Sequence, residues 1–146
     1  MTTIETYYKR FRSYGWLLLP VNPDSKRPLA KSWQEGVKFD IADHDAFGVV
    51  IPKGYVVIDC DNEDAAQRFL DFVGRKLEDM VYTKTPRGYH FWCQTSEEWT
   101  TGANCTTLGK GIDIRAAGTS FVIAPGSKCK HKDTGVLTEY TLHGDL

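Results

Sequence analysis

Two carboxylates stand one residue apart at the end of a strand-like run. Asp59 and Asp61 close the segment 55–61, and a helix-like segment begins directly after them. Side chains alternate along a strand, so both carboxylates are expected on one face, with their Cα atoms about 7 Å apart. At that spacing they can share one divalent ion or bracket two. The alternative interpretation is a solvated strand end followed by the polar start of a helix.

Asp113 supplies a third carboxylate from a different strand. It lies in the run Gly-Ile-Asp-Ile-Arg, where the isoleucines take the apolar face while Asp113 and Arg115 share the other. Three carboxylates around Mg²⁺ or Mn²⁺ form the pattern that clamps a phosphoryl group during in-line displacement. By itself, the run is also typical of a half-buried edge strand.

Basic residues gather around a glycine turn farther along the chain. Lys84, Arg87 and His90 lie within seven residues, and Gly88 lets backbone N–H groups face a ligand. We interpret this run as a candidate triphosphate cradle, although a single histidine is more often structural than functional. Lys26 lies in a loop bounded by prolines and could add a further donor. A plain surface loop is the alternative for that segment.

Two helices are expected to frame these residues. Residues 4, 7, 8 and 11 have the spacing of a helix face, and Thr2 with Glu5 has the form of a capping box. Asn62 is a good N-cap for a second helix. The apolar stripe predicted for that helix consists of Ala65, Ala66, Phe69, Phe72, Val73 and Leu77.

Short strands make up the rest of the expected fold. They are predicted over residues 16–21, 47–51, 55–60, 81–85, 89–94, 112–115, 121–123 and 137–142. The fourth and fifth should form a hairpin across the Pro-Arg-Gly turn, the sixth and seventh should pair, and the last should be an edge strand. The predicted fold class is α+β, with a largely antiparallel sheet and helices packed on it.

Composition excludes several classes of protein. The chain has 146 residues and a net charge of −1, which suits one globular domain and not a polycation that coats nucleic acid. No apolar run approaches the roughly 18 residues of a membrane span, so no membrane partner is expected. Cys60, Cys93, Cys105 and Cys129 form no CxxC pair and are expected to be reduced thiols of a cytoplasmic protein.

A zinc site is not expected. Cys105, Cys129, His131 and His143 include four residues of the right type, but their spacings match no standard finger or knuckle.

Four segments follow one another in an order that resembles a known family. They are GWLLLPVNPDSKRPL, GVVIPKGYVVIDCD, TPRGYHFW and GIDIRAAGTSFVIAPGS, and they run from about residue 15 to about residue 127. The ordered set resembles the N-terminal bifunctional primase–polymerase (prim-pol) domain of the archaeo-eukaryotic primase superfamily, common in phages, plasmids and mobile elements. Each motif alone is weak, so the specificity comes from their order.

The resemblance implies a role for each candidate residue. The family's acidic pair falls on Asp59 and Asp61, and its later acid falls on Asp113; these three would bind two divalent ions, Mg²⁺ or Mn²⁺. The family's small-x-His motif falls on residues 88–90, and His90 would contact the phosphates of the incoming nucleotide.

Four basic residues are expected to assist. Lys26 matches the loop lysine of the family and is predicted to bind nucleotide. Lys84, Arg87 and Arg115 are predicted to neutralise phosphate charge. The sheet would be the superfamily's RNA-recognition-like core, with an N-terminal α/β unit beside it.

The function expected on these grounds is that of a DNA primase/polymerase, a template-directed nucleotidyltransferase of DNA replication. Nucleoside triphosphates and a single-stranded DNA template with its primer are the expected partners. Residues 1–146 are expected to form one catalytic domain, which could be the N-terminal part of a larger protein with a helicase or helical priming domain.

One departure and two alternatives stay open. Gly88 stands where many family members carry serine, which removes a hydroxyl donor to the phosphates. A metal-dependent nuclease or phosphodiesterase would use the same acids on water. A non-catalytic nucleic-acid-binding module would instead show exposed aromatic and basic residues on its sheet, where three acids would repel phosphates.

Overall fold

The computed structural model describes residues 1–105 and 107–146. Two helices and ten strands make up the regular structure of these residues. The helices are α1 (Thr3–Ser13) and α2 (Glu63–Val73). The strands are β1 (Leu18–Pro20), β2 (Phe47–Val50), β3 (Tyr55–Cys60), β4 (Tyr82–Lys84), β5 (Tyr89–Gln94), β6 (Ile112–Ala116), β7 (Phe121–Ile123), β8 (Lys128–Lys130), β9 (Leu137–Glu139) and β10 (Thr141–His143). Short 3₁₀ turns lie at Trp33–Glu35, Ile41–Asp43 and Leu77–Asp79.

The predicted starts of both helices are confirmed. Thr2 Oγ1 accepts a hydrogen bond from the backbone N–H of Glu5 at 3.3 Å and donates one to its carboxylate at 3.0 Å. Asn62 Oδ1 accepts one from the backbone N–H of Ala65 at 2.8 Å. Each side chain therefore satisfies a backbone donor that the first helical turn leaves without a partner. Within the described chain, neither helix is long and apolar enough to cross a membrane.

The predicted apolar stripe of α2 is partly wrong. The buried face consists of Ala65, Ala66, Phe69 and Leu70. Phe72 and Val73 are 63% and 40% exposed. Both belong to the last turn of the helix, which lies outside the cluster that the earlier turns form with β3, β5 and β6. Leu77 packs against this cluster from the 3₁₀ turn that follows α2.

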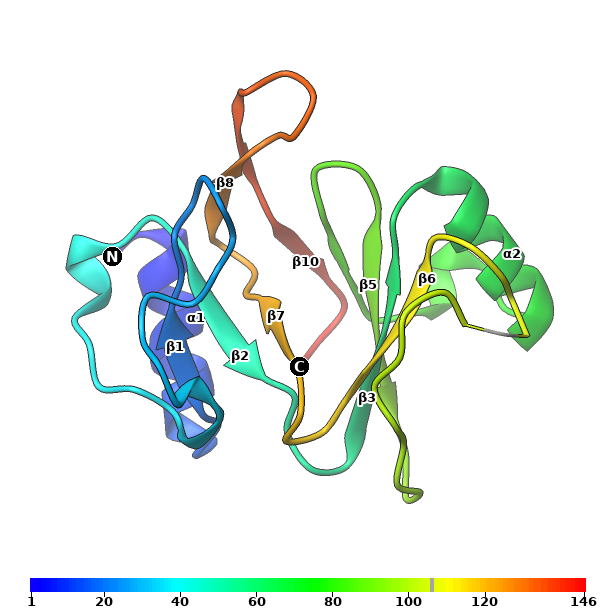
Figure 1. Cartoon of the computed structure of the whole chain (residues 1–146), viewed down its shortest axis with the longest axis horizontal. Helices are drawn as coiled ribbons and strands as arrows, with labels where there is room; N and C mark the ends of the chain where they lie inside the picture. Colours follow the sequence, from blue (N-terminus) through cyan, green and yellow to red (C-terminus); the bar gives the residue numbers. More distant parts are fainter. Residues whose placement is uncertain (106) are drawn as a thin grey trace.

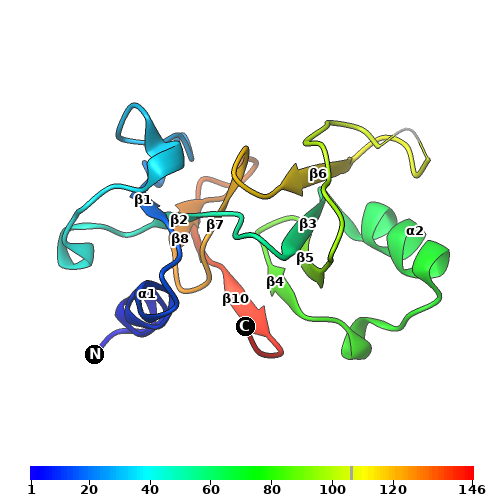
Figure 2. The ribbon, with the colours of Figure 1, turned by 90° about the horizontal axis from the view of Figure 1, so that it is seen from below.

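The strands form antiparallel sheets, as the sequence predicts. A five-stranded sheet has the order β10-β4-β5-β3-β6, a three-stranded sheet has the order β1-β2-β7, and β8 pairs with β9. The predicted hairpin is confirmed, because β4 and β5 are neighbours joined by the turn at residues 85–88. Figures 1 and 2 show α1 with the smaller sheet at one end of the molecule and α2 with the larger sheet at the other. The fold is α+β.

The predicted pairing of β6 with β7 is wrong. β6 pairs with β3 in the larger sheet, whereas β7 pairs with β2 in the smaller one. The reason lies in the link between them. Gly118 donates a backbone hydrogen bond to Ile51 O at 3.0 Å, and Ile51 donates one to Ser120 O at 2.9 Å. These bonds attach the link to the end of β2 and carry the chain from one sheet to the other.

The predicted last strand divides into two. The break falls at Tyr140, whose backbone N–H donates to Ser127 O at 2.8 Å. β9 before it pairs with β8, and β10 after it pairs with β4. β10 is therefore an edge strand of the larger sheet, as expected for the end of this run.

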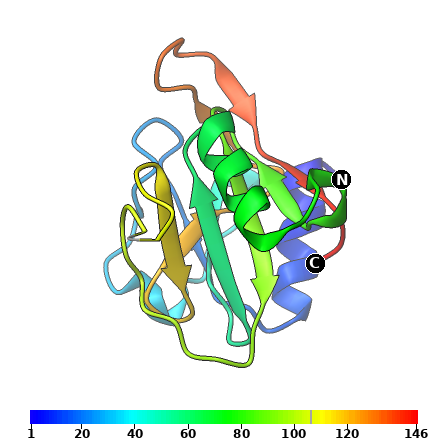
Figure 3. The ribbon, with the colours of Figure 1, turned by 90° about the vertical axis from the view of Figure 1, so that its right-hand side faces the viewer.

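The larger sheet has two faces with different partners. α2 covers one face, as Figure 3 shows. On the other face, Val57 and Trp92 pack in one core cluster with Phe11 of α1. Val57 pairs with Trp92, and two residues farther along β3 Asp59 pairs with His90. Because side chains alternate along a strand, Asp59 and His90 lie on the face that looks toward α1 and the smaller sheet.

Candidate active site

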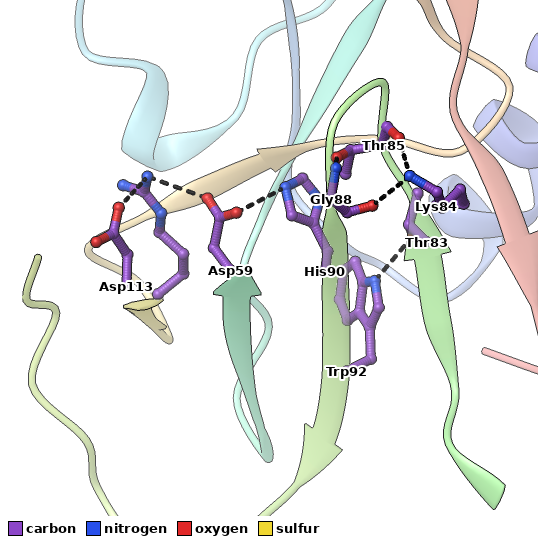
Figure 4. A network of polar contacts seen from close by, with 9 residues as sticks. Asp59, Thr83, Lys84, Thr85, Gly88, His90, Trp92 and Asp113 are labelled. Carbon is purple, nitrogen blue, oxygen red and sulfur yellow. Dashed lines mark hydrogen bonds and ion pairs between the residues drawn. The ribbon is translucent and has the colours of Figure 1, made fainter. Parts of the chain in front are cut away.

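Asp59 lies at the centre of a row of polar residues across three strands. It pairs with His90 of β5 on one side and with Asp113 of β6 on the other. Residues directly opposite each other in antiparallel strands point to one face, with Cβ atoms about 4.5–5.5 Å apart. Figure 4 shows the three side chains side by side, with Asp59 in the middle. The sheet thus brings together residues that three separate motifs supply.

The guanidinium of Arg115 connects the two carboxylates. Its Nη2 lies 3.3 Å from Asp59 Oδ2 and 3.5 Å from Asp113 Oδ2. The other oxygen of Asp59, Oδ1, lies 3.5 Å from Nε2 of His90. Asp113 and Arg115 share one face of β6, as their alternation predicts. Asp59 therefore has a nitrogen atom on each side.

His90 is a buried imidazole. It is 7% exposed, and this burial lowers the pKa of the ring although the neighbouring carboxylate of Asp59 raises it. Its Nδ1 is buried and has no hydrogen-bond partner among the described residues. A buried polar atom in this state is expected to gain its partner from water or from a bound ligand.

Asp61 lies at the rim of the site, one residue past the end of β3. Its side chain is exposed. Partial loss of hydration raises the pKa of its carboxyl, and the negative charges of Asp59 and Asp113 raise it further. The three carboxylates are thus close enough to repel one another, which is the electrostatic condition under which a cation is attracted.

Lys84 does not join this group. Lys84 pairs with Tyr89, whereas His90 pairs with Thr83. Because side chains alternate along a strand, Lys84 points to the opposite face of the sheet from His90. Its Nζ donates to the carbonyl oxygens of Thr85 and Gly88 at 2.8 and 3.0 Å and so closes its own turn. The predicted grouping of Lys84 with His90 in one cradle is not what the structure shows.

Arg87 and Lys26 lie within electrostatic reach of the site. Desolvation raises the pKa of Asp61, and the positive charge of Arg87 opposes part of this rise. The pKa of His90, lowered mainly by burial, is lowered further by the charge of Lys26. Lys26 adopts a left-handed φ of 62° in its proline-bounded loop. Both cations stand near the row of acids without an ion pair to it among the described residues.

A cavity of about 410 Å³ opens beside Asp59. Its ionisable lining consists of Lys26, Asp59, His90 and Arg115. Its remaining lining, which the sequence did not predict, consists of Trp33, Thr101, Thr119, Ser120, Phe121, Val122, Ile123 and Tyr140. Asp59, His90 and Arg115 belong to the five-stranded sheet, whereas residues 121–123 form β7 of the three-stranded sheet. The cavity is therefore lined by both sheets.

Hydroxyls and aromatic rings form the uncharged wall of this cavity. Thr101 Oγ1 lies 2.8 Å from Thr119 Oγ1 and 2.7 Å from Ser120 Oγ. Phe121 meets Trp33 edge to face, with ring centroids 4.9 Å apart. Trp33 lies in a 3₁₀ turn, Thr101 and residues 119–120 lie in loops, and Phe121 begins β7. No single helix or strand pattern in the sequence groups them. Hydroxyls both donate and accept hydrogen bonds, and aromatic rings pack against planar groups.

Gly88 allows the hairpin turn to pack against the end of β3. A Cβ atom at this position would lie 1.9 Å from the carbonyl oxygen of Cys60 and 2.7 Å from the carbonyl carbon of Asp61. The turn is closed by a hydrogen bond from Gly88 N–H to Thr85 Oγ1 at 2.9 Å. The backbone of the turn lies so close to the end of β3 that position 88 has no room for a side chain. This explains why glycine stands here and not serine.

The three acids of the site are of the type that binds a hard divalent cation. Asp59, Asp61 and Asp113 offer carboxylate oxygens, which Mg²⁺ and Mn²⁺ prefer. Within residues 1–105 and 107–146, however, no three His, Cys, Asp or Glu side chains are arranged so that they could hold a metal ion. Arg115 lies between two of the three acids. A cation can bind both of them only after this guanidinium has moved.

A larger cavity, of about 830 Å³, lies at the other end of β3. Its lining includes Trp16, Tyr55 and Trp99 but none of the acids of the row. Lys53, Glu97 and Glu98 also line it, but residues of the three motifs line the smaller cavity.

Comparison with known proteins identifies the family of this chain. Residues 9–141 match the family model Prim-Pol, described as the N-terminal domain of bifunctional DNA primase/polymerase. Comparison with curated proteins gives no match. The matched range covers nearly the whole chain and contains the acids, the histidine and the cavity described above. The chain therefore belongs to the family of bifunctional DNA primase/polymerase N-terminal domains.

Proposed function

We propose that this domain is a metal-dependent nucleotidyltransferase that extends a primer on a single-stranded DNA template during DNA replication. Membership of the family indicates primase/polymerase activity in general. The observation that supports the finer statement is the row formed by His90, Asp59 and Asp113, which borders a cavity lined by Lys26 and Arg115.

Asp59, Asp61 and Asp113 would hold the divalent ions, Mg²⁺ or Mn²⁺. When bound, such ions lower the pKa of the attacking primer hydroxyl and neutralise charge on the leaving pyrophosphate. Strands β3 and β6 fix Asp59 and Asp113, so two of the three acids are held by the sheet itself. Asp61, exposed at the rim, would complete the set from the side of solvent.

The basic residues of the cavity would bind the triphosphate. Lys26 and Arg115 line the cavity, and Arg87 stands near Asp61 at its rim. Burial lowers the pKa of His90 and so favours the neutral imidazole. Its contribution to a phosphate oxygen would then be a hydrogen bond from its one N–H group. Lys84 is left out of this proposal, since its ammonium is engaged with its own turn.

The uncharged wall would receive the nucleoside. Trp33 and Phe121 offer aromatic surface for a planar base, and Thr101, Thr119 and Ser120 offer hydroxyls for a sugar. A nucleoside triphosphate would thus meet a cavity of matching polarity, lined by cations and by aromatic and hydroxyl groups.

Primer extension with Asp59→Asn and Asp113→Asn tests the proposal. Each variant should lose at least about 100-fold of its metal-dependent incorporation, the scale of removing one group that stabilises a transition-state charge. Asp71→Asn is the matched control, because Asp71 lies on the exposed side of α2 and its carboxylate accepts a hydrogen bond from Gln67. Unchanged incorporation by both site variants would refute the assignment.

A second reaction distinguishes polymerase from nuclease. Labelled single-stranded DNA is incubated with Mn²⁺, with and without nucleotides. Extension that needs nucleotides supports the proposal, whereas degradation in their absence would assign the same acids to hydrolysis.

A further inference from the structure

Arg115 lies between two of the three acids that would hold a divalent cation. One nitrogen, Nη2, contacts an oxygen of Asp59 at 3.3 Å and an oxygen of Asp113 at 3.5 Å, and these acids belong to neighbouring strands. A positive group placed between two carboxylates balances their repulsion in the absence of metal.

We propose that Arg115 is an exchangeable counter-ion. It holds the carboxylates of Asp59 and Asp113 when the site is free, and it turns to the triphosphate when nucleotide enters, which opens the acids to metal. Nucleotide and metal then bind interdependently through this one side chain. The inference rests on the proposed function and adds a positioning role for Arg115 to it.

The guanidinium and a bridging metal exclude each other. Mg²⁺ needs carboxylate oxygens at about 2.0–2.1 Å in nearly ideal octahedral geometry. The same oxygens of Asp59 and Asp113 face Nη2 of Arg115 in the free site. A guanidinium and a metal ion at the same pair of oxygens repel each other and compete for the same place. Metal binding to both acids therefore requires displacement of Arg115.

The hold on Arg115 is weak enough for this exchange. Both of its contacts are longer than the roughly 2.7–2.9 Å of a strong charge-assisted hydrogen bond, and its side chain is 35% exposed. Arg68 shows the contrast, since its guanidinium donates to the backbone carbonyls of Leu108 and Lys110. Among the described residues, the guanidinium of Arg115 has hydrogen bonds only to the two acids and none to a backbone carbonyl.

A triphosphate offers Arg115 a better partner than the acids do. The planar guanidinium can bind phosphate oxygens in a bidentate manner, which it does not do with either carboxylate here. Arg115 lines the same cavity as Lys26, so both cations can reach one anionic ligand. The exchange links the two binding events, and linkage requires that each ligand strengthens the other by the same factor.

Mn²⁺ binding followed by electron paramagnetic resonance tests this inference without any turnover. The concentration of free Mn²⁺ is measured with and without a nucleoside triphosphate analogue. In this analogue a methylene group replaces the oxygen that bridges the α- and β-phosphates. The proteins are the wild type, Arg115→Gln and Lys26→Gln. Lys26→Gln is the matched control, because it removes one positive charge from the same cavity and no contact with the acids. Thermal unfolding checks that each variant is folded, and Arg115→Lys provides a second variant that keeps the charge.

Arg115→Gln should bind Mn²⁺ about tenfold more tightly than the wild type in the absence of nucleotide, the scale of removing one competing charge near the surface. The analogue should then tighten Mn²⁺ binding less in this variant than in the wild type, while Lys26→Gln should keep the wild-type metal affinity without nucleotide. The analogue's own affinity for Mn²⁺ is common to all samples and cancels between proteins.

Equal Mn²⁺ affinity of the wild type and Arg115→Gln would overturn the inference. An equal gain in Arg115→Gln and Lys26→Gln would also overturn it, since the effect would then be one of general charge. These results leave the proposed function intact as long as the wild type binds Mn²⁺. If no protein binds Mn²⁺ with or without the analogue, the proposed metal site itself is refuted, and the role of Arg115 is refuted with it.

Discussion

Gly88 is the position where one added carbon should have the largest effect on this site. A Cβ there would lie 1.9 Å from the carbonyl oxygen of Cys60, whereas real Cβ atoms essentially never come within 3.0 Å of another heavy atom. The obstacle is the backbone of β3 and cannot rotate away. The hairpin turn and the end of β3 would have to separate by roughly 1 Å, at the cost of their packing.

The expected cost of Gly88→Ser or Gly88→Ala is at the upper end of the 1–3 kcal/mol typical of overpacking, about 3 kcal/mol. For a domain of this size that corresponds to a fall in Tm of roughly 5–10 °C. The same displacement moves Asp59 and Asp61, and misplacement of reacting groups by about 1 Å can reduce a rate about 100-fold. Restoring the serine of the family pattern should therefore lower both stability and primer extension.

Gly102→Ser is the matched control. Its Cβ would have no heavy atom within 4 Å, and its φ lies outside the left-handed region, so its stability should stay within about 0.5 kcal/mol of the wild type. Tm is measured by calorimetry, and primer extension is measured well below the lowest Tm. If Gly88→Ser melts together with the wild type and the control, the close approach of the hairpin to β3 does not exist.

Two further predictions concern the framework of the site. Ser127→Ala should destabilise the fold by about 1–3 kcal/mol in denaturant unfolding, because the buried Ser127 Oγ accepts from Phe47 N–H at 3.1 Å and donates to Phe47 O at 3.3 Å; an unchanged midpoint would show that water replaces the hydroxyl. Burial, and then hydrogen bonding to Glu63, raise the pKa of Tyr89 to about 12, against about 10 in the unfolded chain. The folded state then holds the extra proton between these values, so stability should fall as pH rises from 10 to 12. Tyr89→Phe should show a shallower fall over this range, and an identical pH profile would contradict the assignment.

The local features of the fold were predictable because they depend on neighbours in the sequence. The caps at Thr2 and Asn62, the strands β3, β5 and β7 and the β4–β5 hairpin all have the predicted places. The order of the motifs also led to the family, which the match over residues 9–141 confirms. The roles of Asp59 and His90 in metal and phosphate binding stay predictions.

The pairing of strands was less predictable, since it depends on residues far apart in the chain. β6 follows β5 and precedes β7 in sequence, yet it pairs with β3. Hydrogen bonds between the β6–β7 link and the end of β2 decide this arrangement, and no local pattern records them. The same holds for Lys84, whose nearness to His90 in sequence gave no warning that the two face opposite sides of the sheet.

The sequence by itself determined which acids and bases this protein has and which of them share a strand face, because alternation and spacing are properties of a short segment. Only the tertiary structure decided that Asp59 stands between His90 and Asp113, that Arg115 bridges two of the acids, and that Gly88 leaves no room for a side chain. Each of these facts is a distance between groups that belong to different strands. Such distances are set by the register and packing of the whole sheet, which the sequence encodes only collectively.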